Sequence, residues 1–191
     1  MKCKEAYEWT QKSEKRKVVL LNLKQPMTAL QLSKKTGFNQ EQCSTILGQL
    51  ALCGLVKCLN PYATRSRLYW LTPAGILCQK KLSKDKTLPN IVKYLPDIDW
   101  ELYGWICYNH RAAIIRALTE PMQPATIKRR AKQQNPKLKM SANNVRDVMK
   151  LFLQKEIVKP VKVKKKTHLR YELTELGCRI QGLLSWAEVP L

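Results

Sequence analysis

The chain has 191 residues, and 45% of them are hydrophobic, which is enough apolar material for one large or two small packed domains. Its 7 Gly and 10 Pro exclude a fibrous or low-complexity composition. No apolar stretch approaches the roughly 18 residues that a membrane span needs, and the polar start at residues 1–5 does not resemble a signal peptide. We therefore expect a protein that is neither secreted nor inserted in a membrane.

Net charge is the strongest feature of the composition. Lys and Arg number 35 against 14 Asp and Glu, a formal net charge of +21. This density of cations creates a positive field over much of the surface, so a polyanion such as nucleic acid is the natural partner. Ribosomal-type and peripheral membrane proteins share this charge, which therefore indicates a class of partner and not one function.

The seven cysteines are odd in number and form no C-x-x-C pair. Most stand in apolar stretches, which predicts small buried side chains in a reducing cytoplasm. A zinc site is the alternative, but neither of the two histidines, His110 and His168, has a paired cysteine near it. We expect no metal and no other cofactor.

The sequence contains an internal repeat. Three segments recur in the same order, the first at an offset of 95 residues and the other two at 102. The matching segments are 16–27 with 111–122, 55–57 with 157–159, and 69–75 with 171–177. One module therefore occurs twice, and the second copy carries an insertion of about seven residues.

We predict two domains joined by a packed segment. Residues 1–82 carry 14 Lys and Arg against 4 Asp and Glu, net +10, and residues 103–191 carry 18 against 6, net +12. The connection, residues 83–102, carries 3 against 4, net −1, and its Pro89 and Pro96 disfavour one long helix. Because a flexible linker would be polar and this segment contains apolar residues, we expect it to pack against a module.

Hydrophobic periodicity and capping residues predict the same order of elements in both copies. In the first copy we expect a helix that ends before Pro26, and then a short helix that starts at 27–29 and is closed by Gly37. A third helix follows, capped by Asn39. Two strands at 55–59 and 67–71 come next, and Thr72 and Pro73 begin the last helix. In the second we expect a helix ending at Pro121, a short helix around 127–130, a third helix capped by Ser141, strands at 157–163 and 169–173, and a last helix capped by Thr174.

The third helix of each copy has an apolar stripe that predicts its buried face. The stripe is Cys43, Ile46, Leu47 and Leu50 in the first copy, and Val145, Val148, Met149 and Phe152 in the second.

Three helices, a hairpin and a closing helix follow the order of a winged helix-turn-helix. The run from a Leu-Val-Lys strand at 55–57 through a basic hairpin to Tyr-x-Leu-Thr-x-x-Gly, at 69–75 and again at 171–177, resembles the wing and closing helix of bacterial and archaeal winged-helix regulators of the MarR-like and PadR-like type. The resemblance covers nearly the whole chain, once per half. It implies a mainly α chain with small β-hairpins (α+β), a tandem winged helix-turn-helix. Because those regulators usually carry one module per chain and form homodimers, their dimer interface is not transferred to this chain.

The resemblance implies that the third helix of each module enters the major groove of DNA and contacts base edges with its N-terminal half. Amide and guanidinium groups can form paired hydrogen bonds with bases, whereas hydroxyls can bind bases or phosphates; a solvated polar face is the alternative interpretation. The candidates are Gln40, Gln42, Ser44, Thr45 and Gln49 in one helix, and Asn143, Asn144, Arg146 and Lys150 in the other. Because the two faces differ, we expect two related but non-identical half-sites.

Cations on the other elements are candidate phosphate contacts, with a solvated charge run as the alternative. They are Arg65 and Arg67 in the first hairpin, Lys162, Lys164, Lys165, Lys166 and Arg170 in the second, and Lys34, Lys35, Lys128, Arg129 and Arg130 on the second helices. The insertion at 133–139 adds two lysines and is interpreted as a loop that touches the duplex.

No Gly-rich phosphate loop, metalloprotease motif or pair of carboxylates in an apolar context occurs, so we do not expect an enzyme. The five tryptophans stand in apolar surroundings, which is typical of core packing. The sequence favours a cytoplasmic, nucleoid-associated or, in a eukaryote, nuclear protein that binds specific double-stranded DNA sequences and regulates transcription. Open alternatives are a replication initiator or mobile-element protein, a winged-helix interaction scaffold, RNA binding, and a homodimer or another protein partner.

Overall fold

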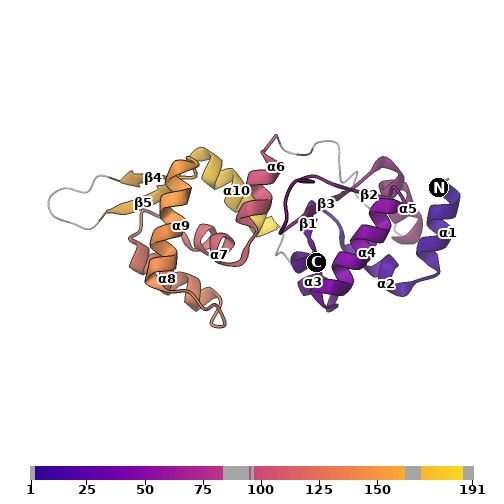
Figure 1. Ribbon diagram of the computed structural model, residues 1–191, viewed down its shortest axis with the longest axis horizontal. Coiled ribbons are helices and arrows are strands. Elements are labelled where there is room, and N and C mark those ends of the chain that lie inside the picture. Colours follow the sequence, from indigo (N-terminus) through magenta and orange to yellow (C-terminus); the bar gives the residue numbers. More distant parts are fainter. Residues whose placement is uncertain (1–2, 84–94, 96, 162–168, 187–191) are drawn as a thin grey trace. The chain divides into compact units, whose positions relative to one another are not determined.

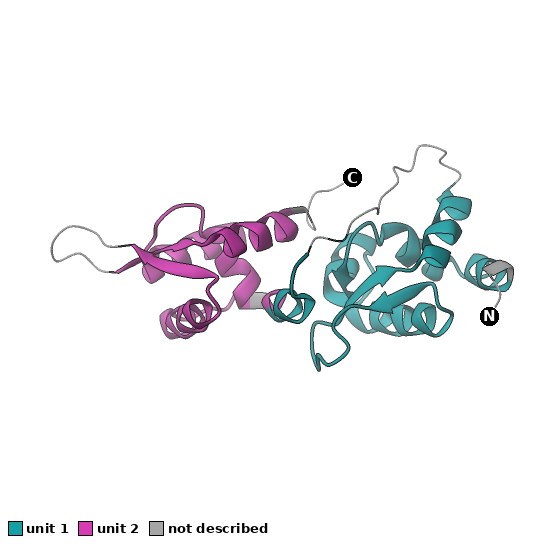
Figure 2. Cartoon of the chain, turned by 90° about the horizontal axis from the view of Figure 1, so that it is seen from above, with its two compact units in different colours: residues 1–105, 190 teal, residues 106–189, 191 magenta. Residues whose placement is uncertain are grey.

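The computed structural model describes residues 3–83, 95, 97–161 and 169–186, and the chain divides into two compact units, unit 1 (1–105) and unit 2 (106–189) (Figure 2). The described residues are mainly helical and include two small antiparallel sheets (Figure 1). The predicted mainly α, α+β class is therefore confirmed. No helix among these residues is both long and apolar enough to cross a bilayer.

Unit 1 has a small sheet packed with helices. Its elements are α1 (Cys3–Gln11), α2 (Glu14–Asn22), β1 (Met27–Thr28), α3 (Ala29–Thr36), α4 (Gln40–Leu52), β2 (Val56–Cys58), β3 (Leu68–Leu71), α5 (Pro73–Ser83) and α6 (Trp100–Ile106). β3 lies between β1 and β2 and is antiparallel to both. The border between the units falls inside α6, a helix that begins within the predicted connecting segment.

Apolar residues from α1 to α5 form one core in unit 1. All four residues of the predicted buried face of α4 belong to it, and none is more than 7% exposed. Trp70 is buried in the same core, while Trp9 packs against it. Leu95 of the connecting segment also packs against this core, and residues 84–94 and 96 lie outside the described part.

The predicted last turn of α3 and the predicted start of α4 are confirmed. Gly37 ends α3 in the left-handed conformation, with φ +74°, which glycine adopts without strain. Asn39 then caps α4: its Oδ1 accepts from the Gln42 backbone N–H at 2.8 Å, and Gln42 Oε1 accepts from the Asn39 N–H at 3.3 Å. Such a reciprocal capping box stabilises a helix start by about 1 kcal/mol.

The sequence predicts that the second helix starts at 27–29, and it begins at the last of these residues, Ala29. Met27 and Thr28 are extended and pair with Tyr69 and Leu68 of β3. Thr28 instead caps α3, with its hydroxyl accepting from the Gln31 N–H. Pairing with a strand some 40 residues away decides the conformation here, and local propensity does not.

Unit 2 has a two-stranded sheet and a similar set of helices. Its elements are α7 (Asn109–Ala117), α8 (Pro124–Gln134), α9 (Ala142–Gln154), β4 (Val158–Val161), β5 (Arg170–Leu173) and α10 (Glu175–Trp186). Met122 bridges to Tyr171 at the position of the β1–β3 pairing in unit 1. On the predicted buried face of α9, three residues are buried and Val148 is half-buried.

The side chains of six of the seven cysteines are described, and they vary in exposure. Cys43, Cys78 and Cys107 are buried, as predicted for small apolar side chains. Cys178 is exposed on α10, so the prediction of burial is wrong for this residue.

The start of the last helix is held in both units by the same pair of threonine hydrogen bonds, which we call the threonine joint. Thr72 Oγ1 donates to the backbone oxygen of Gly54 at 2.6 Å and accepts from the Gly75 N–H at 3.1 Å. In unit 2 the bonds of the same lengths join Thr174 to Glu156 and Gly177. Both threonines therefore act as the predicted helix caps.

A glutamine joins the last helix to an earlier helix in each unit. Gln79 Nε2 donates to the backbone oxygens of Leu20 at 2.7 Å and Leu23 at 3.3 Å. Gln181 Nε2 donates to Ile115 at 2.7 Å and Leu118 at 3.1 Å. These amides bind carbonyl oxygens at the C-terminal ends of α2 and α7, where helices leave carbonyl groups short of partners. The Leu20 and Ile115 oxygens also accept from the cap N–H groups of Leu23 and Leu118.

Replacing Glu156 with glycine is expected to stabilise unit 2. Glu156 has φ +53°, the left-handed conformation that its counterpart Gly54 adopts at φ +72°. A side chain costs roughly 1–2 kcal/mol in this conformation, and glycine recovers part of that, so we expect a gain of about 0.5–1 kcal/mol in the free energy of unfolding. Denaturant unfolding of both variants measures it, with Gly54→Ala as the reverse change that should destabilise unit 1.

Candidate nucleic-acid interface

The exposed face of α9 carries polar and charged side chains opposite its buried stripe. Asn143, Asn144, Arg146 and Lys150 are all exposed, as the sequence predicts for residues available to a partner. Arg146 Nη1 donates to Asn143 Oδ1 at 2.9 Å, so these two side chains lie side by side on the first turns of the helix. The face can offer both hydrogen-bond donors and positive charge.

The corresponding face of α4 differs in charge. Gln40, Ser44 and Thr45 are exposed, whereas Gln42 and Gln49 are half-buried. The helix has no Lys or Arg, and its one ionisable carboxylate is Glu41. This face can donate and accept hydrogen bonds, but it does not itself attract a polyanion.

Two of the predicted base-contacting amides are occupied by helix caps. Gln42 accepts from the Asn39 N–H, and Asn144 Oδ1 accepts from the Ser141 N–H at 3.0 Å and hydroxyl at 2.7 Å. A contact to adenine that uses both the oxygen and the nitrogen of either amide would have to open its cap. The base-contacting role of these two residues stays a prediction, and in this structure each amide oxygen is held by its cap.

Cations follow α8 along its exposed side. Arg129 and Lys132 are exposed and Lys128 is half-buried. Arg130 Nη2 forms an ion pair with Glu120 at 3.1 Å, and its Nη1 donates to the Thr119 hydroxyl, so its charge is partly compensated. Lys132 was absent from the sequence-based candidates, although its spacing of four from Lys128 places both on one side of the helix.

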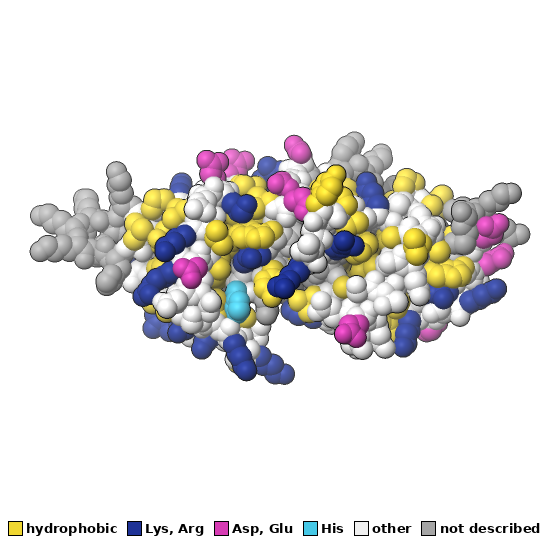
Figure 3. Space-filling view, in the orientation of Figure 1, with side chains coloured by type: hydrophobic (Ala, Val, Ile, Leu, Met, Phe, Trp, Pro, Cys, Tyr) yellow, Lys and Arg dark blue, Asp and Glu magenta, His cyan; other side chains and the backbone are white. Residues whose placement is uncertain are grey.

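The loop between α8 and α9 presents two further lysines. Lys137 and Lys139 are exposed, while the alternate residues Leu138 and Met140 are 5% and 4% exposed and hold the loop against the unit. A hydrogen bond of 2.6 Å joins His110 Nε2 to the backbone oxygen of Lys139. The insertion is thus an anchored loop, although its first residues, 133 and 134, extend α8. Figure 3 shows Lys and Arg side chains gathered over α8 and this loop.

The α8–α9 pair of unit 2 and the α3–α4 pair of unit 1 therefore differ strongly in charge. We call the α8–α9 helix pair with its loop, residues 124–155, the basic surface. It holds Asp147 as its one acidic residue and nine cations: Lys128, Arg129, Arg130, Lys132, Lys137, Lys139, Arg146, Lys150 and Lys155. The matching α3–α4 segment, residues 28–53, holds Lys34 and Lys35 against Glu41.

On α3, Lys34 is exposed and Lys35 is half-buried. Burial, and then the positive charge of Lys24, lowers the pKa of the Lys35 ammonium. A bound anion would offset the repulsion between Lys24 and Lys35 and so raise this pKa again.

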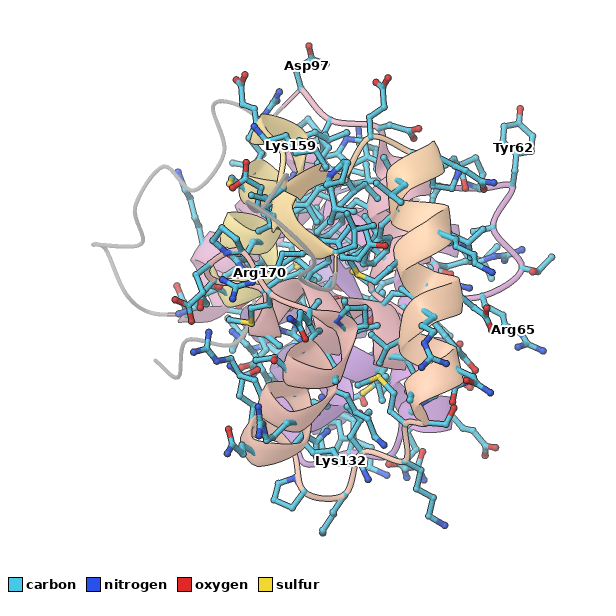
Figure 4. The ribbon with its side chains drawn as sticks, turned by 90° about the vertical axis from the view of Figure 1, so that its left-hand side faces the viewer. Tyr62, Arg65, Asp97, Lys132, Lys159 and Arg170 are labelled. Carbon is cyan, nitrogen blue, oxygen red and sulfur yellow. The ribbon has the colours of Figure 1, made fainter. Side chains whose placement is uncertain are left out.

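The hairpins place further candidates at the solvent. Arg65 and Arg67 are exposed in the β2–β3 loop, and Arg67 Nε donates to the Ala63 oxygen at 3.0 Å. On the β4–β5 pair, Arg170 is exposed and Lys159 forms an ion pair with Glu172 at 3.1 Å (Figure 4). The predicted hairpin lysines, Lys162, Lys164, Lys165 and Lys166, lie outside the described residues.

Comparisons of the chain with protein-family models, curated proteins and solved structures gave no match, so its function is inferred from the geometry and charge described above.

Proposed function

We propose that the chain is a tandem winged helix-turn-helix protein that binds double-stranded DNA and regulates transcription. The order of helices, hairpin and closing helix in each unit supports this fold, as do the shared threonine and glutamine joints. In such a fold α4 and α9 are the helices that enter the major groove.

The observation that carries the proposal is the basic surface of unit 2. Its cations lie on two adjacent helices and the anchored loop between them, with Asp147 as the one acidic residue. DNA attracts such a surface because phosphate contacts release condensed counterions, a gain that a neutral protein partner does not offer. A polar α9 face within the same surface supplies groups that can contact base edges.

The two units contribute unequally in this proposal. The basic surface supplies most of the affinity, because the α3–α4 segment has far less positive charge. The polar face of α4 would then add sequence preference, through Ser44 and Thr45 more than through the capping Gln42. Two half-sites of unequal strength follow.

Binding to duplex DNA is expected to depend steeply on salt. Roughly six to ten phosphate contacts from the two units would give a slope of log K against log salt of about −5 to −9. Fluorescence anisotropy with a labelled random-sequence duplex at several salt concentrations measures this slope. A slope shallower than about −2 would exclude binding through phosphate contacts and with it the proposed function.

A further inference from the structure

The β2–β3 loop of unit 1 exposes an aromatic side chain that the core does not use. Tyr62 is 91% exposed at this loop, whereas Trp70 of the same hairpin is buried. Arg65 is exposed three residues later, and Figure 4 shows both side chains projecting outward from the loop. A partner with an apolar face would remove the area of this ring from water, which favours binding.

A buried asparagine fixes the backbone that carries Tyr62. Asn60 has no exposed surface; its Oδ1 accepts from the Leu68 N–H at 2.6 Å, and its Nδ2 donates to the Ser66 oxygen at 3.2 Å. The Asn60 backbone oxygen accepts from the Ala63 N–H at 3.1 Å. These bonds tie both sides of the loop together, so the backbone has less conformational entropy to lose when a ligand binds.

Backbone strain marks the same loop. Ser66 has φ +55°, a conformation that costs a non-glycine residue of order 1 kcal/mol or more. The adjacent Arg67 holds the turn by its bond to the Ala63 oxygen. The strained turn keeps Tyr62 and Arg65 on the solvent side of one rigid loop.

The positive charge and the exposed aromatic ring of the loop indicate which class of ligand it can bind. Residues 53–72 include Lys57, Arg65 and Arg67 and no acidic residue. A flat aromatic ring among cations suits a ligand with flat apolar faces and negative charge, which is a description of a nucleotide strand. In a duplex both faces of each base are covered by neighbouring bases, so the ring can stack only where bases are unpaired.

We propose that this loop binds single-stranded nucleic acid, with Tyr62 stacked on an unpaired base and Arg65 on a neighbouring phosphate. This site lies in unit 1 and is independent of the duplex binding proposed for the basic surface. The sequence between β4 and β5, residues 162–168, has three consecutive lysines and no Phe, Tyr or Trp, so it offers no equivalent of Tyr62.

Anisotropy with a labelled strand of about 12 thymidines tests the proposal, since single-strand sites span about 4–16 nucleotides. Tyr62→Ala should weaken single-strand binding by at least about fivefold, while Tyr62→Phe, which keeps the ring, should stay within about twofold of the wild type. Leu52→Ala is the matched control, because Leu52 is also 91% exposed in unit 1 and should leave binding unchanged. Tyr62 is too exposed for its loss to unfold the unit.

Equal single-strand affinity of Tyr62→Ala and the wild type would overturn the proposal and favour a protein as the partner of the loop. A loss as large in Tyr62→Phe as in Tyr62→Ala would overturn stacking, because the hydroxyl would then be the contacting group. Measuring the duplex in parallel separates the two proposals: the Tyr62 variants should bind the duplex as the wild type does, and absence of duplex binding would reject the proposed function alone.

Discussion

Replacing Gly177 with alanine is expected to unfold unit 2 under conditions in which unit 1 remains folded. An alanine Cβ would overlap the backbone oxygen of Ile157 and lie 3.1 Å from Leu173 Cβ. Because a backbone oxygen cannot rotate away, α10 would have to move off the start of β4 and break the Thr174 joint. We expect a loss of about 3 kcal/mol or more in the free energy of unfolding, which lowers the melting temperature by roughly 12 °C or more.

Thermal unfolding followed by circular dichroism measures this loss, and hydrogen exchange assigns it to unit 2. Gly182→Ala is the matched control on the same helix, since no described atom beyond its chain neighbours and the surrounding helix backbone lies within 4 Å of the added Cβ. That change should stabilise α10 by about 1 kcal/mol, because alanine is favoured over glycine inside a helix. If Gly177→Ala were as stable as the wild type, the close approach of α10 to Ile157 would be wrong.

Removing three cations from the basic surface is expected to weaken duplex binding by about ten- to a hundredfold at low salt. The changes are Arg129→Ala, Lys132→Ala and Lys137→Ala, which spare Arg130 because it is already paired with Glu120. The salt slope should become shallower by about three units, one for each cation that no longer binds a phosphate. The loss of affinity should be similar for all duplex sequences, because phosphate contacts carry no sequence information.

A control variant removes the same charge from unit 1. Lys12, Lys80 and Lys81 are exposed on or beside α1 and α5, and their replacement by alanine should change duplex affinity much less. Equal losses in the two triple variants would mean that net charge attracts DNA without a defined surface. Unchanged binding after loss of the three unit 2 cations would show that the basic surface does not contact the duplex.

Features that depend on nearby residues were predictable from the sequence. Asn39, Ser141, Thr72 and Thr174 act as the helix caps that their positions indicate, because a cap is decided within four residues. The buried face of α4 was equally accessible, since the spacing of Cys43, Ile46, Leu47 and Leu50 fixes one side of a helix.

Other features depend on contacts that the sequence does not display. The strand at Met27 exists because Tyr69 lies beside it. The helix α1 was not predicted, although Ala6, Tyr7 and Thr10 recur at helical spacing and lie on its buried side. The capping role of Gln42 and Asn144 could have been found, because an amide three residues after a cap residue is the pattern of a capping box. The anchoring of the insertion by His110 could not, because 29 residues separate the two groups.

The threonine and glutamine hydrogen bonds shared by the two units show which side chains this fold uses in both halves of the chain. Two copies of one module have accumulated different sequences inside a single chain, yet threonine, glycine and glutamine still occupy the same joints, at 72, 75 and 79 and at 174, 177 and 181. The outward faces of α4 and α9 have diverged instead, one neutral or acidic and the other basic. The two units therefore share the residues that fix their frame and differ on the surface that α4 and α9 present.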